Sequence, residues 1–282
     1  MTDLTTAGAA QGFGLAYGIG REIVMVDVTL HLFRPQAFDD LSVTQGRQGA
    51  GVHDLGLAAG EERGAVYPGY PGTELQKWLT EKTGLPCTVE NDVNAAALGE
   101  YWLGAGKGAK SLFCITVGTG IGGCIILDGR VIHGASYSAG EAGLQHIRPE
   151  GNWEEIASTS ALIRNVAKAK QVPEGELNGK KIFAMAQRGD ADALEGITRQ
   201  MDDLAAGIAN ICYILNPERI IIGGGIAAQE KYLYPMLDKA LRKKLLPLVY
   251  EKVTLRFAAL KNDAGMIGAL CYFLMREKER KK

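Results

Sequence analysis

The sequence lacks the features that mark several broad classes of protein. Its 282 residues include 31 Lys and Arg against 32 Asp and Glu, so there is no basic surplus of the kind that binds nucleic acid. No apolar stretch approaches the roughly 18 residues that a membrane span needs. The N-terminus shows no basic segment followed by an apolar one, so no signal peptide is expected. These absences predict a cytoplasmic protein with no nucleic-acid or membrane partner.

Cysteine is also scarce, and its pattern argues against disulfides. The chain has five cysteines and no Cys-x-x-Cys pair. They are Cys87, Cys114, Cys124, Cys212 and Cys271. Most lie in apolar runs, which predicts buried free thiols in a reducing compartment. Glycine, in contrast, is abundant at 37 residues, which predicts tight turns and close backbone approaches.

From residue 67 onward, strand patterns and helix patterns alternate. This order predicts an α/β protein with mixed sheets. The expected strands are residues 87–90, 111–117, 122–127, 219–222 and 253–258. The expected helices are residues 74–82, 93–103, 153–170, 181–188, 193–215, 231–244 and 264–276. Asp128-Gly129 is typical of a hairpin turn. Residues 1–56 contain one strand candidate, at residues 22–30, and otherwise no clear periodicity.

The first candidate site is Glu90-Asn91-Asp92-Val93-Asn94, where an expected strand ends and a helix begins. Ligands of open α/β sheets bind beyond the carboxyl ends of the strands. A helix N-terminus favours an ionised carboxylate, so Asp92 could accept a proton from a hydroxyl that attacks a phosphate. The simpler alternative is that Asn91 or Asp92 only caps the helix.

Two glycine turns are candidates for a nucleotide site. Residues 118–123 join two expected strands, and their backbone N–H groups and the Thr119 hydroxyl could line a phosphate. Residues 223–225 are three glycines after an apolar strand, which leaves space for a flat ring or a phosphate. Neither turn is a Walker A loop or a dinucleotide fingerprint. An ordinary tight turn is the alternative for each.

Two glutamates complete the set of candidate residues. Glu141 lies in a turn of small residues, and Glu154 opens an expected helix. Carboxylates in a cleft are good acceptors for sugar hydroxyls. Compensation of the helix dipole is the alternative for Glu154. A glycosidase or peptidase that uses both carboxylates is a further alternative, although the neighbouring glycine turns fit it poorly.

Taken in this order, these segments resemble the ROK family of sugar kinases and repressors. Asn216-Pro217-Glu218 and residues 263–269 match as well, and the resemblance runs from about Gly64 to the C-terminus. It implies an actin-like ATPase fold of the ribonuclease H-like type, with two lobes and mixed sheets around a central cleft. The smaller lobe would hold residues 1–104 together with the C-terminal helix, residues 264–282. The larger lobe would hold residues 105–263.

The resemblance also implies an activity, namely ATP-dependent phosphorylation of a hexose or a β-glucoside with Asp92 as general base. The sugar would be bound by Asn91, Glu141 and Glu154. The nucleotide would be held by Gly118, Thr119, Gly120, Gly223, Gly224 and Gly225. Mg²⁺ would come with ATP. Members of the family are commonly dimers, which makes a homodimer an expectation here.

The chain departs from the family pattern in two ways. Leu144 stands where many members have the His of a zinc site, and no Cys lies between Cys124 and Cys212, which argues against zinc and for the branch that includes β-glucoside kinases. The phosphate loop Asp-x-Gly-Gly-Thr does not occur in residues 1–66. A catalytically impaired sugar-binding protein is therefore the alternative function. A repressor is disfavoured, because residues 1–56 are neither basic nor helically periodic.

Overall fold

A computed structural model of the protein describes residues 75–282. The expected strand at residues 22–30 and the first residue of the helix expected at residues 74–82 lie outside the described residues. So does the segment in which the phosphate loop was sought, residues 1–66.

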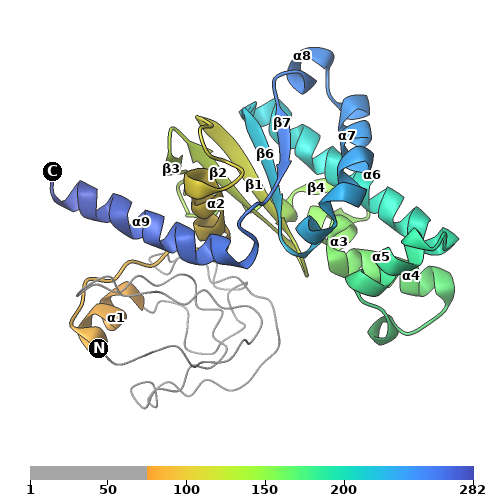
Figure 1. The fold of residues 1–282 in the computed structure, drawn as a ribbon, viewed down its shortest axis with the longest axis horizontal. Helices are drawn as coiled ribbons and strands as arrows, with labels where there is room; N and C mark the ends of the chain where they lie inside the picture. Colours follow the sequence, from red (N-terminus) through yellow and green to blue (C-terminus); the bar gives the residue numbers. More distant parts are fainter. Residues whose placement is uncertain (1–74) are drawn as a thin grey trace.

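A five-stranded mixed sheet is the centre of the described part of the chain (Figure 1). Its strand order is β3-β2-β1-β6-β7. The bounds are β1 Ser111–Val117, β2 Ile121–Leu127, β3 Arg130–Val131, β6 Arg219–Gly223 and β7 Thr254–Phe257. β2 is antiparallel to β1 and β3, whereas β6 is parallel to β1 and β7. The expectation of an α/β protein with a mixed sheet is therefore confirmed.

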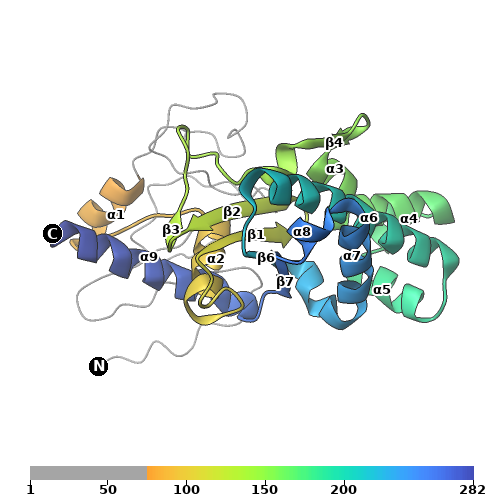
Figure 2. The same cartoon turned by 90° about the horizontal axis from the view of Figure 1, so that it is seen from above.

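Helices cover both faces of this sheet. Their bounds are α1 Leu75–Thr83, α2 Asp92–Leu103, α3 Trp153–Ala157, α4 Thr159–Lys170, α5 Gly179–Gln187, α6 Ala191–Leu215, α7 Glu230–Lys244, α8 Pro247–Tyr250 and α9 Ala264–Arg280. A short hairpin of β4 His146–Arg148 and β5 Gly151–Asn152 precedes α3. Figure 2 shows α2 and α9 on one side of the sheet and α6 and α7 on the other.

Alternation along β1 sends its side chains into two apolar cores. Leu112 and Cys114 belong to the core that includes residues of α2 and α9. Phe113, Ile115 and Val117 belong to the larger core formed with α3 to α7. Successive strand residues point to opposite faces. A strand that is buried on both faces needs the near-continuous apolar run that this segment of the sequence has.

Two of the expected elements are corrected by the structure. Residues 87–90 have no regular secondary structure and pair with no described strand, and a strand exists only where a neighbour shares its hydrogen bonds. The helix expected at residues 153–170 is interrupted at Ser158. This residue has extended backbone, and its hydroxyl caps α4 by accepting a hydrogen bond from the Ala161 N–H at 3.1 Å. The short elements β4, β5 and α8 have no counterpart among the expectations, because they are too short to show a period.

The crossing of α2 and α9 is a contact that only glycine permits. A Cβ built on Gly268 would lie 1.5 Å from the Ala95 carbonyl oxygen, and one built on Gly99 would lie 2.2 Å from the Ala264 carbonyl oxygen. In both cases the obstacle is backbone, which cannot move without displacing a helix. The C-terminal helix is thus packed against α2, and the division of the chain into two lobes stays a prediction.

A buried carboxylate fixes the start of α9 from the same side. Glu100, in α2, is 1% exposed. It accepts hydrogen bonds from the backbone N–H groups of Ala105 at 2.7 Å, Ala259 at 3.1 Å and Leu260 at 2.8 Å. These bonds offset the cost of removing the charge from water. They connect α2 to the segment that leads into α9.

We expect Gly268→Ala to lower the free energy of unfolding by about 3 kcal/mol or more, since overpacking against movable side chains alone costs typically ~1–3 kcal/mol. Urea unfolding followed by circular dichroism measures the change. Gly265→Ala is the matched control on the same helix, because no described atom lies within 4 Å of a Cβ built there. The control should shift stability by less than about 1 kcal/mol. Equal effects of the two substitutions would show that the crossing is not tight.

Candidate active site

The two glycine turns lie side by side at one edge of the sheet. β1 and β6 are parallel, with Thr116 paired to Gly223, so both turns follow the carboxyl ends of adjacent strands. Gly224 has a φ of 77°, and a Cβ built on it would lie 2.5 Å from the Val117 carbonyl oxygen. The backbones of the two turns are therefore in direct contact. This edge is where ligands of α/β sheets bind.

Open space borders both turns, and a phosphate chain fits that arrangement. No described atom lies within 4 Å of a Cβ built on Gly118 or Gly225, and Thr119 is exposed. The Gly118 N–H donates to the Gly120 carbonyl at 3.0 Å. Gly118 would therefore leave room for a phosphate because it has no side chain, and it would not donate its N–H to that phosphate. Close approach of backbone to a ligand is a use for which glycine is suited.

Glu154 lies against the first of these turns. A capping box, in which Asn152 and Glu155 exchange hydrogen bonds, fixes the start of α3, where Glu154 lies. Glu154 Oε2 accepts a hydrogen bond from the Ile121 N–H at 3.3 Å, and a Cβ built on Gly120 would lie 2.6 Å from the same oxygen. The carboxylate is thus placed beside the predicted phosphate turn.

The turn that carries Glu141 is pressed against β2. Gly140 has a φ of 97°, and a Cβ built on it would lie 2.5 Å from the Gly123 carbonyl oxygen. A Cβ on Gly123 would lie 2.5 Å from the Gly140 carbonyl oxygen in turn. Both positions therefore require glycine. This contact fixes the place of Glu141 relative to the sheet.

Asn91 and Asp92 form the start of α2. Asn91 Oδ1 accepts hydrogen bonds from the N–H groups of Val93 at 2.9 Å and Asn94 at 3.1 Å, and Asp92 Oδ1 accepts from Val93 at 2.7 Å. Asn91 therefore caps α2 through Oδ1. Asp92 is half-buried. Val93 contacts β2, because a Cβ built on Gly122 would lie 2.8 Å from Val93 Cγ2. The residue that follows Asp92 thus packs against the strand after the first glycine turn.

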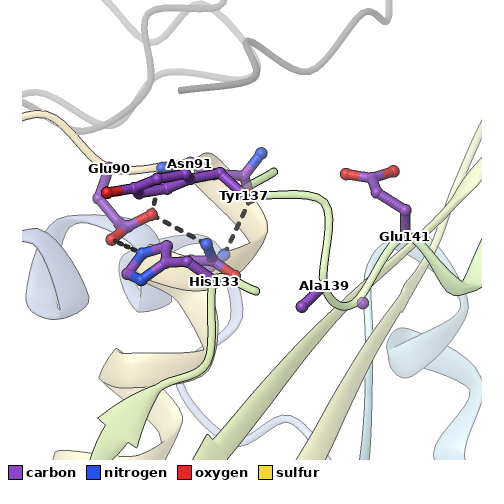
Figure 3. A pocket seen from close by; sticks show the side chains of 8 residues that line it. Glu90, Asn91, His133, Tyr137, Ala139 and Glu141 are labelled. Carbon is purple, nitrogen blue, oxygen red and sulfur yellow. Dashed lines mark hydrogen bonds and ion pairs between the residues drawn. The ribbon is translucent and has the colours of Figure 1, made fainter. Parts of the chain in front are cut away.

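A polar pocket opens beside the N-terminus of α2 (Figure 3). It is lined by Glu90, Asn91, Asn94, Gly123, His133, Tyr137, Ala139 and Glu141. Two of the predicted sugar ligands, Asn91 and Glu141, therefore share one pocket. Asp92 directly follows a lining residue. Glu154 does not line this pocket and instead contacts the glycine turn.

Three lining residues received no role from the sequence. Glu90 is 3% exposed, and its Oε1 accepts from the Asn91 N–H and from Asn94 Nδ2, both at 2.9 Å. Its Oε2 lies 2.8 Å from His133 Nε2. Tyr137 contacts His133, with ring centroids 5.0 Å apart. No local pattern joins Glu90 to a histidine 43 positions away. The one signal in the sequence for these lining residues is that Tyr137 is bulky in a loop of small residues.

The five cysteines are all buried and free, as expected. Burial, with a smaller contribution from Glu100, raises the pKa of Cys114 to about 12, and burial raises the pKa of Cys212 to about 11. These thiols are therefore protonated at neutral pH. Among residues 75–282, no group of three or more His, Cys, Asp and Glu could hold a metal ion. Within that range, no helix combines the length and apolar character needed to cross a membrane.

Comparisons with known proteins agree with this fold. The sequence profile of the ROK family matches residues 65–276. A glucokinase from Halalkalibacterium halodurans is 37% identical over 225 residues, covering 72% of this chain and 68% of the relative. A beta-glucoside kinase from Listeria monocytogenes is 33% identical over 210 residues, covering 72% and 70%. The crystal structure of a ROK family glucokinase from Streptomyces griseus, in complex with glucose and AMPPNP, aligns with a TM-score of 0.64 at 30% identity over 71% and 72% of the two chains.

The mixed sheet and its helices thus define an α/β protein with the actin-like ATPase fold. The chain belongs to the ROK family. Both the fold and the family expected from the sequence are confirmed. Because the relatives are sugar kinases, the similarity supports a carbohydrate kinase.

We expect Gly224→Ala to destabilise the fold by about 3 kcal/mol or more, through left-handed strain and a clash with Val117 backbone. Gly189→Ala is the control, since Gly189 has a φ of 87° but no described atom within 4 Å of a built Cβ. Its cost should be roughly 1–2 kcal/mol, from strain alone. Thermal unfolding compares the two variants. If they lose the same stability, the contact between the glycine turns is not important for the fold.

Proposed function

We propose that the protein transfers the γ-phosphoryl group of ATP to a hydroxyl of a hexose or a β-glucoside, with Asp92 as general base. One observation carries the proposal, namely that α2 begins with Asp92 and that the next residue, Val93, packs against the strand that continues the open glycine turn. The names of the relatives, glucokinase and beta-glucoside kinase, support this class of acceptor.

The nucleotide would be held mainly by backbone. Gly118, Thr119 and Gly120 would contact the phosphates, and residues 223–225 would border the adenosine. The open space at Gly118 and Gly225 supports this placement. Mg²⁺ would arrive with ATP and neutralise part of the phosphate charge. No zinc ion is required in this reaction, and the argument against a zinc site stays a prediction from the sequence.

The acceptor sugar would be bound by Asn91, Glu141 and Glu154. Because Asn91 Oδ1 is used by the backbone of α2, this side chain would donate to a hydroxyl through Nδ2. Glu141 would accept from a hydroxyl within the pocket. Glu154 already accepts from Ile121 through Oε2, so its other oxygen would face the sugar near the phosphate turn.

Asp92 would take the proton of the attacking hydroxyl. The positive end of the α2 dipole favours the charged carboxylate. One oxygen, Oδ1, accepts from the Val93 N–H at 2.7 Å, which orients the group. The proton passes to the carboxylate as the sugar oxygen bonds to the γ-phosphorus and ADP leaves. Positioning and charge supply most of the rate enhancement in reactions of this kind.

Asp92→Asn is expected to lower kcat roughly 10²-fold or more, because the amide can still cap α2 but cannot accept the proton. Steady-state kinetics with ATP and the best sugar measure this. Asp192→Asn is the matched control, since Asp192 also lies in the first turn of a helix and is not among the lining residues of the pocket. It should keep the wild-type kcat. A normal kcat in Asp92→Asn would refute the assigned role.

A catalytically impaired sugar-binding protein is the second candidate function. The observation that favours it is the absence of Asp-x-Gly-Gly-Thr from residues 1–66. Phosphoryl transfer depends on protein groups that position the phosphates, as this loop would. Sugar binding does not depend on such groups.

We expect coupled ADP release with at least one hexose or β-glucoside when a sugar panel is assayed. The same sugars should raise the melting temperature, because ligands that bind only the folded state stabilise it. A thermal shift without ADP release, in wild-type protein supplied with Mg²⁺ and ATP, would replace the kinase proposal with the sugar-binding one.

A further inference from the structure

Tyr137 stands at the rim of the pocket in a backbone conformation that bulky residues rarely adopt. Its φ is 54°, in the left-handed region, where a side chain is sterically unfavourable. The ring is 43% exposed, so core packing does not explain its presence there. Strained residues of this kind are concentrated at ligand sites. The other residues of the loop are small, so the bulky side chain of Tyr137 stands at the position with the strained backbone.

His133 supports the Tyr137 ring and is itself held by a buried carboxylate. The two rings have centroids 5.0 Å apart and are tilted by 44°. His133 Nε2 lies 2.8 Å from Glu90 Oε2. The other oxygen of Glu90 accepts from Asn91 and Asn94. Both carboxylate oxygens of Glu90 therefore contact other residues of the pocket lining rather than a ligand.

The lining of the pocket combines polar groups with aromatic rings (Figure 3). Asn91 and Glu141 provide an amide and a carboxylate, whereas His133 and Tyr137 provide aromatic rings. A pyranose also presents both polar and apolar surfaces, because its hydroxyls lie around the rim and its C–H groups lie on the faces. Polar groups at the rim and a ring against a face are the complement of such a sugar.

We propose that Tyr137 is a specificity-determining residue whose ring covers a C–H face of the bound pyranose. It would select sugars whose ring hydroxyls are all equatorial, as in glucose and its β-glucosides. An axial hydroxyl would be pressed against the ring without a hydrogen-bond partner. Glu90 and His133 are the positioning residues of this ring. The inference rests on the proposed acceptor site and names its substrate class.

Tyr137→Gly tests the inference without threatening the fold, because glycine relieves the left-handed backbone. We expect the KM for glucose to rise about three- to tenfold, the effect of losing one aromatic contact. The kcat and the KM for ATP should change by less than about twofold. The preference in kcat/KM for glucose over mannose and galactose should fall by a similar factor. Tyr137→Phe keeps the ring and should restore most of the preference for glucose that Tyr137→Gly loses.

Gln171→Gly is the matched control for the backbone change. Gln171 has a φ of 57° at the C-terminus of α4 and does not line the pocket. It should gain the same stability with an unchanged KM. His133→Ala should raise the KM for glucose, and it should add little to Tyr137→Gly in the double variant, since it acts through that ring.

An unchanged glucose KM and an unchanged epimer preference in Tyr137→Gly would overturn the inference and leave the kinase proposal standing. If the chain phosphorylates no sugar, calorimetry with glucose and mannose decides the matter. Weaker glucose binding by Tyr137→Gly would then support the inference although the kinase proposal fails. Equal glucose binding by variant and wild type, or no binding by the wild type, would overturn it.

Discussion

The parallel pairing of β1 with β6 is the interaction on which the site depends. Its register sets Thr116 opposite Gly223, so the two glycine turns leave the sheet at the same level and come into backbone contact at Gly224. Packing enforces this register. Ile220 and Ile222 belong to the larger core, whereas Ile221 belongs to the core with α2 and α9. A slip of one residue would exchange these faces, so the cores that stabilise the sheet also align the turns.

Asp92 is placed by contacts that take no part in chemistry. The helix that begins with it is held at its start by Glu90, which bonds to Asn91 and Asn94, and near its end by Glu100, which bonds to Ala259 and Leu260. Between these points it crosses α9 with no room for side chains. Two buried carboxylates and a glycine crossing thus fix the helix at three levels. A general base needs such support, because a displaced base loses its reach to the hydroxyl.

Sequence patterns predicted the secondary-structure elements that are determined by residues close together in the chain. The apolar runs of β1 and β6 and the long amphipathic α6 were found within two residues of their ends, because burial imposes their periodicity. The pattern of residues 87–90 predicts a strand that the structure does not have, since pairing with a neighbour leaves no trace in the segment itself. The contact of Glu90 with His133 was missed for the same reason. The motifs did identify Asn91, Glu141 and the glycine turns, which the fold gathers at one edge of the sheet, while their roles remain proposals.

The proposed nucleotide site and the proposed acceptor pocket are built in different ways. In this proposal, sugar binding is therefore separate from phosphoryl transfer. In the proposal, the nucleotide turns would act through absent side chains and backbone contact, whereas the acceptor pocket is assembled from side chains between Glu90 and Glu141. The residues that the structure describes around this pocket all belong to that segment. The absence of Asp-x-Gly-Gly-Thr from residues 1–66 bears on the proposed transfer of the phosphoryl group. The proposed contacts of Asn91 and Glu141 with the sugar would not require that loop.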